Sequence, residues 1–212
     1  MSDNNDEIGV DYDPIAEEYA ETFFNELEHK PLDRQFLDRF AGLVSGLGPV
    51  CDLGCGPGQI ARYLKDKDIP AFGLDLSVKM VEKARQLNPD IEFIQGDMTA
   101  LEAEDDSWGG IAAFYVIIHI PHARVVDTLR ELRRVLVPGG WLLLTFHIGD
   151  ETLHLDEWHK KPVALDIILF PTAQMEAYLI EAGFEIVETI ERDAYKGVEY
   201  ESRRAYIFAQ KP

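Results

Sequence analysis

The chain has 212 residues, of which 46% are hydrophobic and 10% aromatic, enough for one domain with a substantial buried core. Acidic residues number 39 against 20 basic ones, so the formal net charge is -19, and such a field disfavours nucleic acid and anionic membranes as partners. No apolar run approaches the roughly 18 residues that cross a bilayer. The acidic, polar start is unlike a secretory signal, so we expect a cytoplasmic protein.

The amino-terminal part is expected to be a flexible tail over residues 1–12, followed by helices within residues 13–48. Apolar residues four positions apart indicate a helix that begins near Asp13, because Pro14 suits a first helical turn and Asp13 the cap before it. A second helix is expected over residues 32–44, ended by the glycines and the proline that follow.

Strands and helices then alternate over residues 49–146. Short apolar runs predict strands over residues 50–53, 71–74, 91–94, 111–118 and 141–146. Helical patterns cover residues 58–65 and 77–87, with Ser77 as a cap, and begin again at Pro121, before a turn at Pro138-Gly139-Gly140. Since parallel strands need a crossover, this order predicts a single-domain α/β fold with a doubly wound, mostly parallel sheet.

The last part, residues 171–212, is expected to hold a helix over residues 172–182 and a closing antiparallel pair of strands over residues 184–190 and 204–209. Residues 147–170 break the alternation, and long connections in compact domains are usually lids or binding loops. We therefore expect a substrate lid there. Its histidines and acids follow no known ligand spacing, so no metal is expected, and substrate recognition is the preferred role.

The two cysteines, Cys51 and Cys55, are too few for a disulfide framework. A zinc site would need two further ligands, and an iron–sulfur cluster would need at least a third cysteine. We interpret both as ordinary residues beside a bound cofactor.

Three glycines at alternating positions, Gly54, Gly56 and Gly58, follow the first predicted strand. Glycine permits positive φ and a close approach of backbone N–H groups to a ligand. A phosphate-binding P-loop would end in Gly-Lys-Ser/Thr, whereas Gln59 follows here, and the dinucleotide fingerprint places its glycines at positions one, three and six. The spacing alone leaves open which ligand, if any, the loop holds.

Two further acids stand at strand ends. Asp75 follows the first glycine by roughly 20 residues, where a carboxylate can accept the hydroxyls of a ribose. Asp97 and Met98 end the third strand, where an acid could bind an adenine amino group and an apolar neighbour could pack on the ring. Helix capping and a simple turn are the structural alternatives for these positions.

Four motifs in this order resemble those of class I S-adenosylmethionine-dependent methyltransferases of the small-molecule type: Asp52-Leu-Gly-Cys-Gly-Pro-Gly58, Gly73-Leu-Asp75-Leu-Ser77, Gly96-Asp97-Met98 and Leu136-Val-Pro-Gly-Gly-Trp141. The resemblance implies a Rossmann-like seven-stranded sheet with an antiparallel last strand and an amino-terminal helical lid. It also implies S-adenosyl-L-methionine as cofactor and S-adenosyl-L-homocysteine as product.

Roles follow from the resemblance. The glycine loop would cradle the methionine and ribose portions, and Tyr12 and Tyr19 would face the sulfonium, since aromatic faces attract cations. The implied cofactor-binding residues are Tyr12, Tyr19, Asp52, Gly54, Cys55, Gly56, Asp75, Leu76, Met80, Asp97, Met98 and Tyr115.

Two histidines are candidates for proton acceptors, because imidazole titrates near neutral pH. His119 lies just past the fourth predicted strand, and His147 ends the fifth. The Asp/Asn-Pro-Pro-Tyr/Trp motif of nucleic-acid amino methyltransferases is replaced by Phe114-Tyr115-Val116-Ile117. With the acidic charge, this favours a small-molecule acceptor methylated on oxygen, nitrogen or carbon.

Two other functions remain open from the sequence. A nicotinamide-dependent oxidoreductase could use the same sheet, and Tyr63 and Lys67 match a Tyr-x-x-x-Lys catalytic pair, although in the first helix after the glycine loop. A non-catalytic domain that only binds S-adenosylmethionine would keep the cofactor residues without turnover.

Overall fold

A computed structural model describes residues 12–212. The helices are η1 (Asp13–Ile15), α1 (Ala16–Phe23), η2 (Glu26–His29), α2 (Pro31–Val44), α3 (Gln59–Lys65), α4 (Val78–Leu87), η3 (Ile117–His119), α5 (His122–Val135) and α6 (Thr172–Glu181), where η marks a 3-10 helix. The strands are β1 (Val50–Leu53), β2 (Ala71–Asp75), β3 (Phe93–Gln95), β4 (Trp108–Phe114), β5 (Leu136–His147), β6 (Thr152–Trp158), β7 (Lys161–Ile168), β8 (Glu185–Arg192) and β9 (Arg204–Gln210).

The central sheet has seven strands in the order β3-β2-β1-β4-β5-β9-β8. The first five pair in parallel, while β9 runs antiparallel to both β5 and β8. The strand order reverses beside β1, which is the switch point at which open α/β sheets bind ligands. The predicted doubly wound sheet, with its antiparallel last strand, is confirmed.

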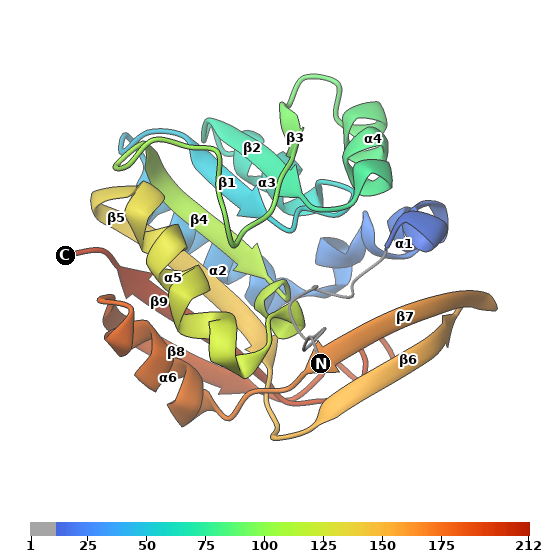
Figure 1. Ribbon diagram of the computed structural model, residues 1–212. Helices are drawn as coiled ribbons and strands as arrows, with labels where there is room; N and C mark the ends of the chain where they lie inside the picture. Colours follow the sequence, from blue (N-terminus) through green and yellow to red (C-terminus); the bar gives the residue numbers. More distant parts are fainter. Residues whose placement is uncertain (1–11) are drawn as a thin grey trace, which may run out of the picture.

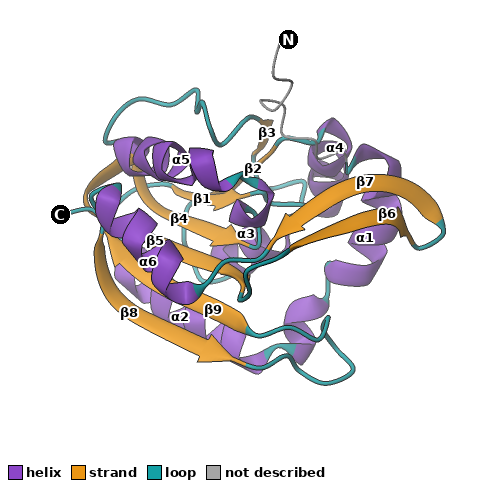
Figure 2. Cartoon of the chain, turned by 60° about the horizontal axis from the view of Figure 1, so that its bottom comes forward, coloured by secondary structure: helices purple, strands orange, loops and turns teal. Residues whose placement is uncertain are grey.

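Helices cover both faces of this sheet (Figures 1 and 2). One apolar core joins α5 and α6 to the sheet, and a second joins α2 and α3 to the opposite face. The apolar side of α5 recurs every three or four residues at Val125, Leu129 and Leu132, all fully buried, as an amphipathic helix requires. This arrangement leaves the carboxyl ends of the parallel strands free for a ligand.

Two predicted boundaries are wrong. The strand expected over residues 111–118 ends at Phe114, because Tyr115 takes a φ of 55° and η3 follows. The β-branched residues 116–118 favour a strand, but the backbone turns after Phe114 at the edge of the sheet. Likewise β5 includes the expected turn at Pro138-Gly139-Gly140, where the pairing with β4 shifts between Trp108 and Gly110 and the extra residues bulge outward.

The amino-terminal helix is also shorter than expected. It divides into η1, α1 and η2, and the cap residue of η1 is Tyr12. Asp13 does not cap its own helix. Its Oδ1 accepts hydrogen bonds from the Ser77 hydroxyl at 2.5 Å and from the Lys79 N–H at 3.2 Å, so it ties the amino-terminal segment to the start of α4.

Residues 147–170 form a β-hairpin rather than an irregular loop. Strands β6 and β7 pair as a separate two-stranded sheet that projects beside α1 (Figure 1). Near its turn, Trp158 packs on Tyr19 and Phe23 of α1, with ring centroids 5.8 and 6.1 Å apart, and Lys161 pairs with Glu18. Within residues 12–212, none of the helices combines the length and apolar character needed to cross a membrane.

Gly73→Ala is expected to destabilise the sheet. A Cβ at residue 73 would lie 2.4 Å from Cδ1 of Phe93, which is 1% exposed and cannot move aside. Overpacking of this kind costs about 1–3 kcal/mol. Gly42→Ala is the matched control, because a Cβ at residue 42 meets nothing within 4 Å. Since alanine is preferred to glycine inside a helix, this variant should be more stable by about 0.5–1 kcal/mol. Urea unfolding of both variants measures this, and equal stabilities would contradict the packing described.

Candidate functional site

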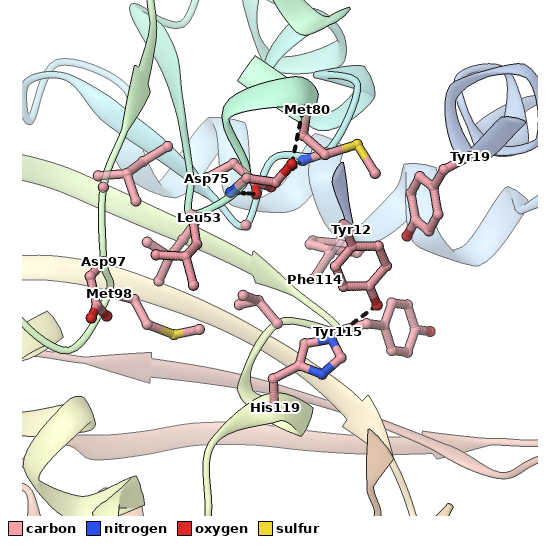
Figure 3. Close-up of a pocket in the computed structure, with 17 residues that line it drawn as sticks. Tyr12, Tyr19, Leu53, Asp75, Met80, Asp97, Met98, Phe114, Tyr115 and His119 are labelled. Carbon is pink, nitrogen blue, oxygen red and sulfur yellow. Dashed lines mark hydrogen bonds between the residues drawn. The ribbon is translucent and has the colours of Figure 1, made fainter. Parts of the chain in front are cut away.

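A cavity of about 750 Å³, measured with its open mouth, lies at the carboxyl ends of β1, β2 and β4 and is covered by the amino-terminal segment (Figure 3). It is lined by Tyr12, Tyr19, Leu53, Gly54, Gly56, Leu74, Asp75, Leu76, Ser77, Met80, Gly96, Asp97, Met98, Phe114, Tyr115, Val116 and His119. The structure thus brings together most of the site residues predicted from sequence. Asp52, Cys55 and His147 are predicted site residues that do not line it.

The glycine loop forms one wall. Gly54 and Gly56 have φ of 68° and 51°, a region that favours glycine. A Cβ at residue 54 would lie 2.3 Å from Cγ2 of Val116, so a side chain there would collide with the opposite wall. The N–H groups of Gly54 and Cys55 donate to the Leu74 carbonyl at 2.7 and 3.0 Å, which fixes the loop to β2.

Asp52 and Cys55 support this loop from behind. Asp52 is 1% exposed, and its Oδ2 accepts a hydrogen bond from the Ala61 N–H at 2.9 Å, which ties β1 to α3. Burial raises the pKa of Asp52 to about 7, against the opposing effect of that hydrogen bond. Cys55 is buried, and burial raises the pKa of its thiol, so it remains a neutral packing residue.

Asp75 both shapes the loop and faces the cavity. Its Oδ2 accepts from the Gly56 N–H at 2.8 Å and its Oδ1 from the Ser77 N–H at 2.9 Å. Burial raises the pKa of Asp75, and these two donors oppose that shift. A carboxylate has about four lone-pair positions, so each oxygen can accept a further hydrogen bond from a ligand.

The far wall comes from β3, α4 and the loops beside them. Asp97 is held by the N–H and the hydroxyl of Thr99, both 2.8 Å from its Oδ1. Met98 packs against the core, Met80 is 2% exposed, and Leu76 is 42% exposed at the rim. An acid beside a flat apolar surface can hold a ring that carries an amino group.

Aromatic rings close the opposite end. Tyr12 lies edge-on to both Tyr19 and His119, at 5.5 Å between ring centroids in each case. The Tyr12 hydroxyl is 3.1 Å from Nε2 of His119, and Nδ1 of His119 is 3.0 Å from the carbonyl oxygen of Asp166 on β7 (Figure 3 shows the first contact). His119 therefore joins the amino-terminal segment, η3 and the hairpin.

His119 is neutral in this position. Burial lowers its pKa, although the Asp166 carbonyl opposes the shift. Because a carbonyl only accepts, Nδ1 must carry the proton, and Nε2 then presents its lone pair to the cavity. The arrangement can accept a proton from a hydroxyl there.

His147 lies behind Tyr115 and outside the cavity lining. Its ring stacks on Tyr115 with centroids 4.8 Å apart, and its Nδ1 is 2.8 Å from the Ser202 hydroxyl. Burial, and then the charges of Arg204 and Lys30, lower the pKa of His147 to about 4. It is a neutral ring that supports Tyr115.

Six lining residues were missing from the predicted set: Leu53, Leu74, Ser77, Gly96, Phe114 and Val116. All are neighbours of predicted residues at the ends of strands, and this adjacency is the signal that could have found them. His154 is exposed and bonds Asp156 and Asp166, while His159 stacks on Trp158 near the hairpin turn. Within residues 12–212, no group of three His, Cys, Asp or Glu side chains could hold a metal ion.

The stability of the protein should depend on His147 between about pH 4 and 6.5. Its folded pKa of about 4 lies below the usual histidine value of 6.5, so the unfolded chain binds the extra proton in this window. The contribution of His147 to the free energy of unfolding is complete above about pH 6.5. It falls as the pH drops, by up to about 1.4 kcal/mol per pH unit. His147→Phe keeps the stacked ring and removes the titration.

Urea unfolding of the wild type and His147→Phe across this pH range measures the difference in slope. Asp52, whose pKa is raised to about 7, titrates in both proteins, so it cancels in the comparison. Parallel stability curves would show that His147 is not buried as described.

Comparison with known proteins finds a family model that matches the segment carrying this site. Residues 50–140 match the sequence family Methyltransf_25, described as "Methyltransferase domain". The matched segment runs from β1 into β5, so it contains the glycine loop, Asp75, Asp97 and His119.

Two curated relatives extend the match. The malonyl-[acyl-carrier protein] O-methyltransferase of Enterobacter lignolyticus is 29% identical over 147 residues, which cover 66% of this chain and 56% of the relative. The demethylmenaquinone methyltransferase of Thermotoga maritima is 36% identical over 137 residues, which cover 63% of this chain and 58% of the relative. The chain thus spans little more than half the length of these curated relatives.

Solved structures share the fold. An S-adenosylmethionine-dependent methyltransferase from Methanosarcina mazei superposes with a TM-score of 0.72 at 17% identity, over 80% of this chain and 95% of that one. A glycopeptide N-methyltransferase complexed with S-adenosylmethionine gives a TM-score of 0.64 at 17% identity, over 84% and 94%. Residues 50–140 thus match a methyltransferase domain, and the solved structures show that the chain shares the fold of S-adenosylmethionine-dependent methyltransferases.

Proposed function

We propose that the protein transfers a methyl group from S-adenosylmethionine to a small-molecule acceptor and releases S-adenosylhomocysteine. The observation that carries this proposal is the cavity at the switch point, in which a glycine wall, two acids and an aromatic end with a neutral histidine face one space. The glycine wall, the two acids and His119 lie at or after the ends of β1, β2, β3 and β4, so the sheet brings them together, and the amino-terminal segment adds Tyr12 and Tyr19.

The residues fit the cofactor by their chemistry. The positive φ of Gly54 and Gly56 lets the loop backbone approach a ligand where a side chain would intrude. Asp75 retains lone pairs that suit ribose hydroxyls, and Asp97 with Met98 suits an adenine. Tyr12 and Tyr19 offer ring faces that attract a sulfonium.

The cofactor, when bound, supplies a methyl group made electrophilic by the sulfonium. The chain must then align the acceptor, exclude water and take up a proton where the acceptor loses one. His119 is the proton acceptor in this proposal, because its Nε2 lone pair faces the cavity. The hairpin and α1 cover the same end, which limits access of water.

Tyr63 and Lys67 give no support to a nicotinamide-dependent reaction. Both lie on or just after α3 and outside the cavity lining, and the Tyr63 hydroxyl donates to Asp38 at 2.9 Å. Experiment distinguishes an enzyme from the alternative, a non-catalytic domain that only binds the cofactor. Such a domain would bind S-adenosylhomocysteine without methylating any acceptor.

Calorimetric titration with S-adenosylhomocysteine, with NAD as the control, tests the cofactor. We expect micromolar binding of the former and none of the latter, because Gln59 stands where the dinucleotide fingerprint has its third glycine. Binding of NAD alone would overturn the proposal. Methyl release from labelled S-adenosylmethionine across a panel of acceptors then separates an enzyme from a binding domain.

Asp75→Asn should weaken binding of S-adenosylhomocysteine about tenfold or more, because the amide loses the charge and one acceptor oxygen. The loss should be specific to the ribose. Adenosine should bind the wild type better than 2′,3′-dideoxyadenosine, and the variant should bind both equally. Asp90→Asn is the control, since Asp90 is exposed and pairs with Arg62 away from the cavity. A preference for adenosine that survives in Asp75→Asn would remove the ribose role.

A further inference from the structure

The Tyr12–His119 pair occupies the part of the cavity nearest the hairpin. The phenol hydroxyl is 3.1 Å from Nε2, and the Tyr12 ring stands edge-on between Tyr19 and His119 (Figure 3). Nδ1 carries the ring proton and donates it in a hydrogen bond to the Asp166 carbonyl. Nε2 is therefore unprotonated, and Tyr12 must be the hydrogen-bond donor to it. The Tyr12 hydroxyl therefore already donates a hydrogen bond to Nε2 of His119, the atom proposed to take up a proton.

The charges around this pair limit what else can bind there. The cavity lining contains two carboxylates, Asp75 and Asp97, and among the lining residues of the described chain there is no lysine or arginine. Asp166 adds a negative charge near His119 besides the hydrogen bond to its backbone carbonyl. An acceptor carboxylate would be desolvated here with no positively charged side chain in the lining to pair with, which is costly.

The walls beside the pair are aromatic. Phe114 and Tyr115 line the cavity with Tyr19, and each presents a ring face or edge. Planar rings pack well on such surfaces. The site therefore combines aromatic walls, one proton acceptor and no positive side chain.

Building on the function proposed above, we propose that the acceptor is a neutral, ring-bearing molecule with a weakly acidic hydroxyl, a phenol or enol, which takes from Tyr12 the hydrogen bond to Nε2 of His119. Tyr12 is then a specificity-determining residue. Its phenol hydroxyl occupies Nε2 of His119 until the hydroxyl of an acceptor replaces it.

The transfer balances with the groups described. The acceptor oxygen forms a bond to the methyl carbon as the bond from that carbon to sulfur breaks, and the electron pair of the broken bond stays on sulfur. The hydroxyl proton passes to Nε2 of His119. The resulting imidazolium later loses this proton to water, while its other N–H remains on the Asp166 carbonyl.

Binding of four matched probes tests the acceptor class: 4-nitrophenol, 4-nitroanisole, 4-nitroaniline and 4-nitrobenzoate. Each is titrated into the full chain saturated with S-adenosylhomocysteine, at a pH below the pKa of 4-nitrophenol so that its hydroxyl stays protonated. We expect 4-nitrophenol to bind best. In Tyr12→Phe, which removes the competing donor, its affinity should rise about fivefold, as the loss of one competing hydrogen bond implies. Tyr63→Phe, a phenol removed outside the cavity, should leave the affinity unchanged.

His119→Phe should remove the preference for 4-nitrophenol over 4-nitroanisole, because only the hydroxyl needs Nε2. Mass spectrometry after incubation with S-adenosylmethionine should find 4-nitroanisole formed from 4-nitrophenol. Preferred binding of 4-nitrobenzoate or 4-nitroaniline, no binding of 4-nitrophenol, or an unchanged preference in His119→Phe would each overturn the proposal. If S-adenosylhomocysteine binds but the phenol does not, the acceptor class fails and the methyl-transfer function stands. If S-adenosylhomocysteine does not bind, the function itself fails.

Discussion

The Asp75 carboxylate is the interaction on which the rest of the site depends. Its two oxygens accept from the N–H groups of Gly56 and Ser77, so one side chain fixes both the glycine loop and the start of α4. Asp13 bonds the same Ser77, which places the amino-terminal segment, and Tyr12 with it, over the cavity. A buried carboxylate pays for its desolvation only when such donors surround it, and here they do.

A second constraint lies behind Tyr115, whose left-handed backbone is unusual for a bulky residue. Its hydroxyl is 3.3 Å from that of Tyr206, which donates to Asp33 at 3.0 Å, and Arg192 bonds both Asp33 and Glu199. Burial alone would raise the pKa of Glu199, but Arg192, the Tyr195 N–H, Lys30 and Arg204 together lower it to about 2. Breaking one member would leave a buried charge unpaired, so the cluster holds Tyr115 firmly.

The sequence was informative wherever local chemistry decides structure. Apolar runs that alternate with helical patterns predicted the sheet, and the resemblance to class I methyltransferases implied most of the cavity lining. It was less informative where distant segments meet. The N–H of Tyr115 donates to Thr145 on β5, and the pKa of His147 is lowered first by burial and then by Arg204 and Lys30, which approach from other parts of the chain. The hairpin within residues 147–170 was missed although β6 and β7 alternate exposed and less exposed residues, which is the period-two pattern of half-buried strands.

That hairpin contacts both His119 and the aromatic wall of the cavity. The proton on Nδ1 of His119 is held by the Asp166 carbonyl, which belongs to β7, so the orientation of the Nε2 lone pair depends on β7 remaining in place. The same strand pair packs through Trp158 on Tyr19 of α1, whose ring also lines the cavity. One strand pair therefore contributes both to the aromatic wall of the cavity and to the hydrogen bond that fixes the tautomer of His119.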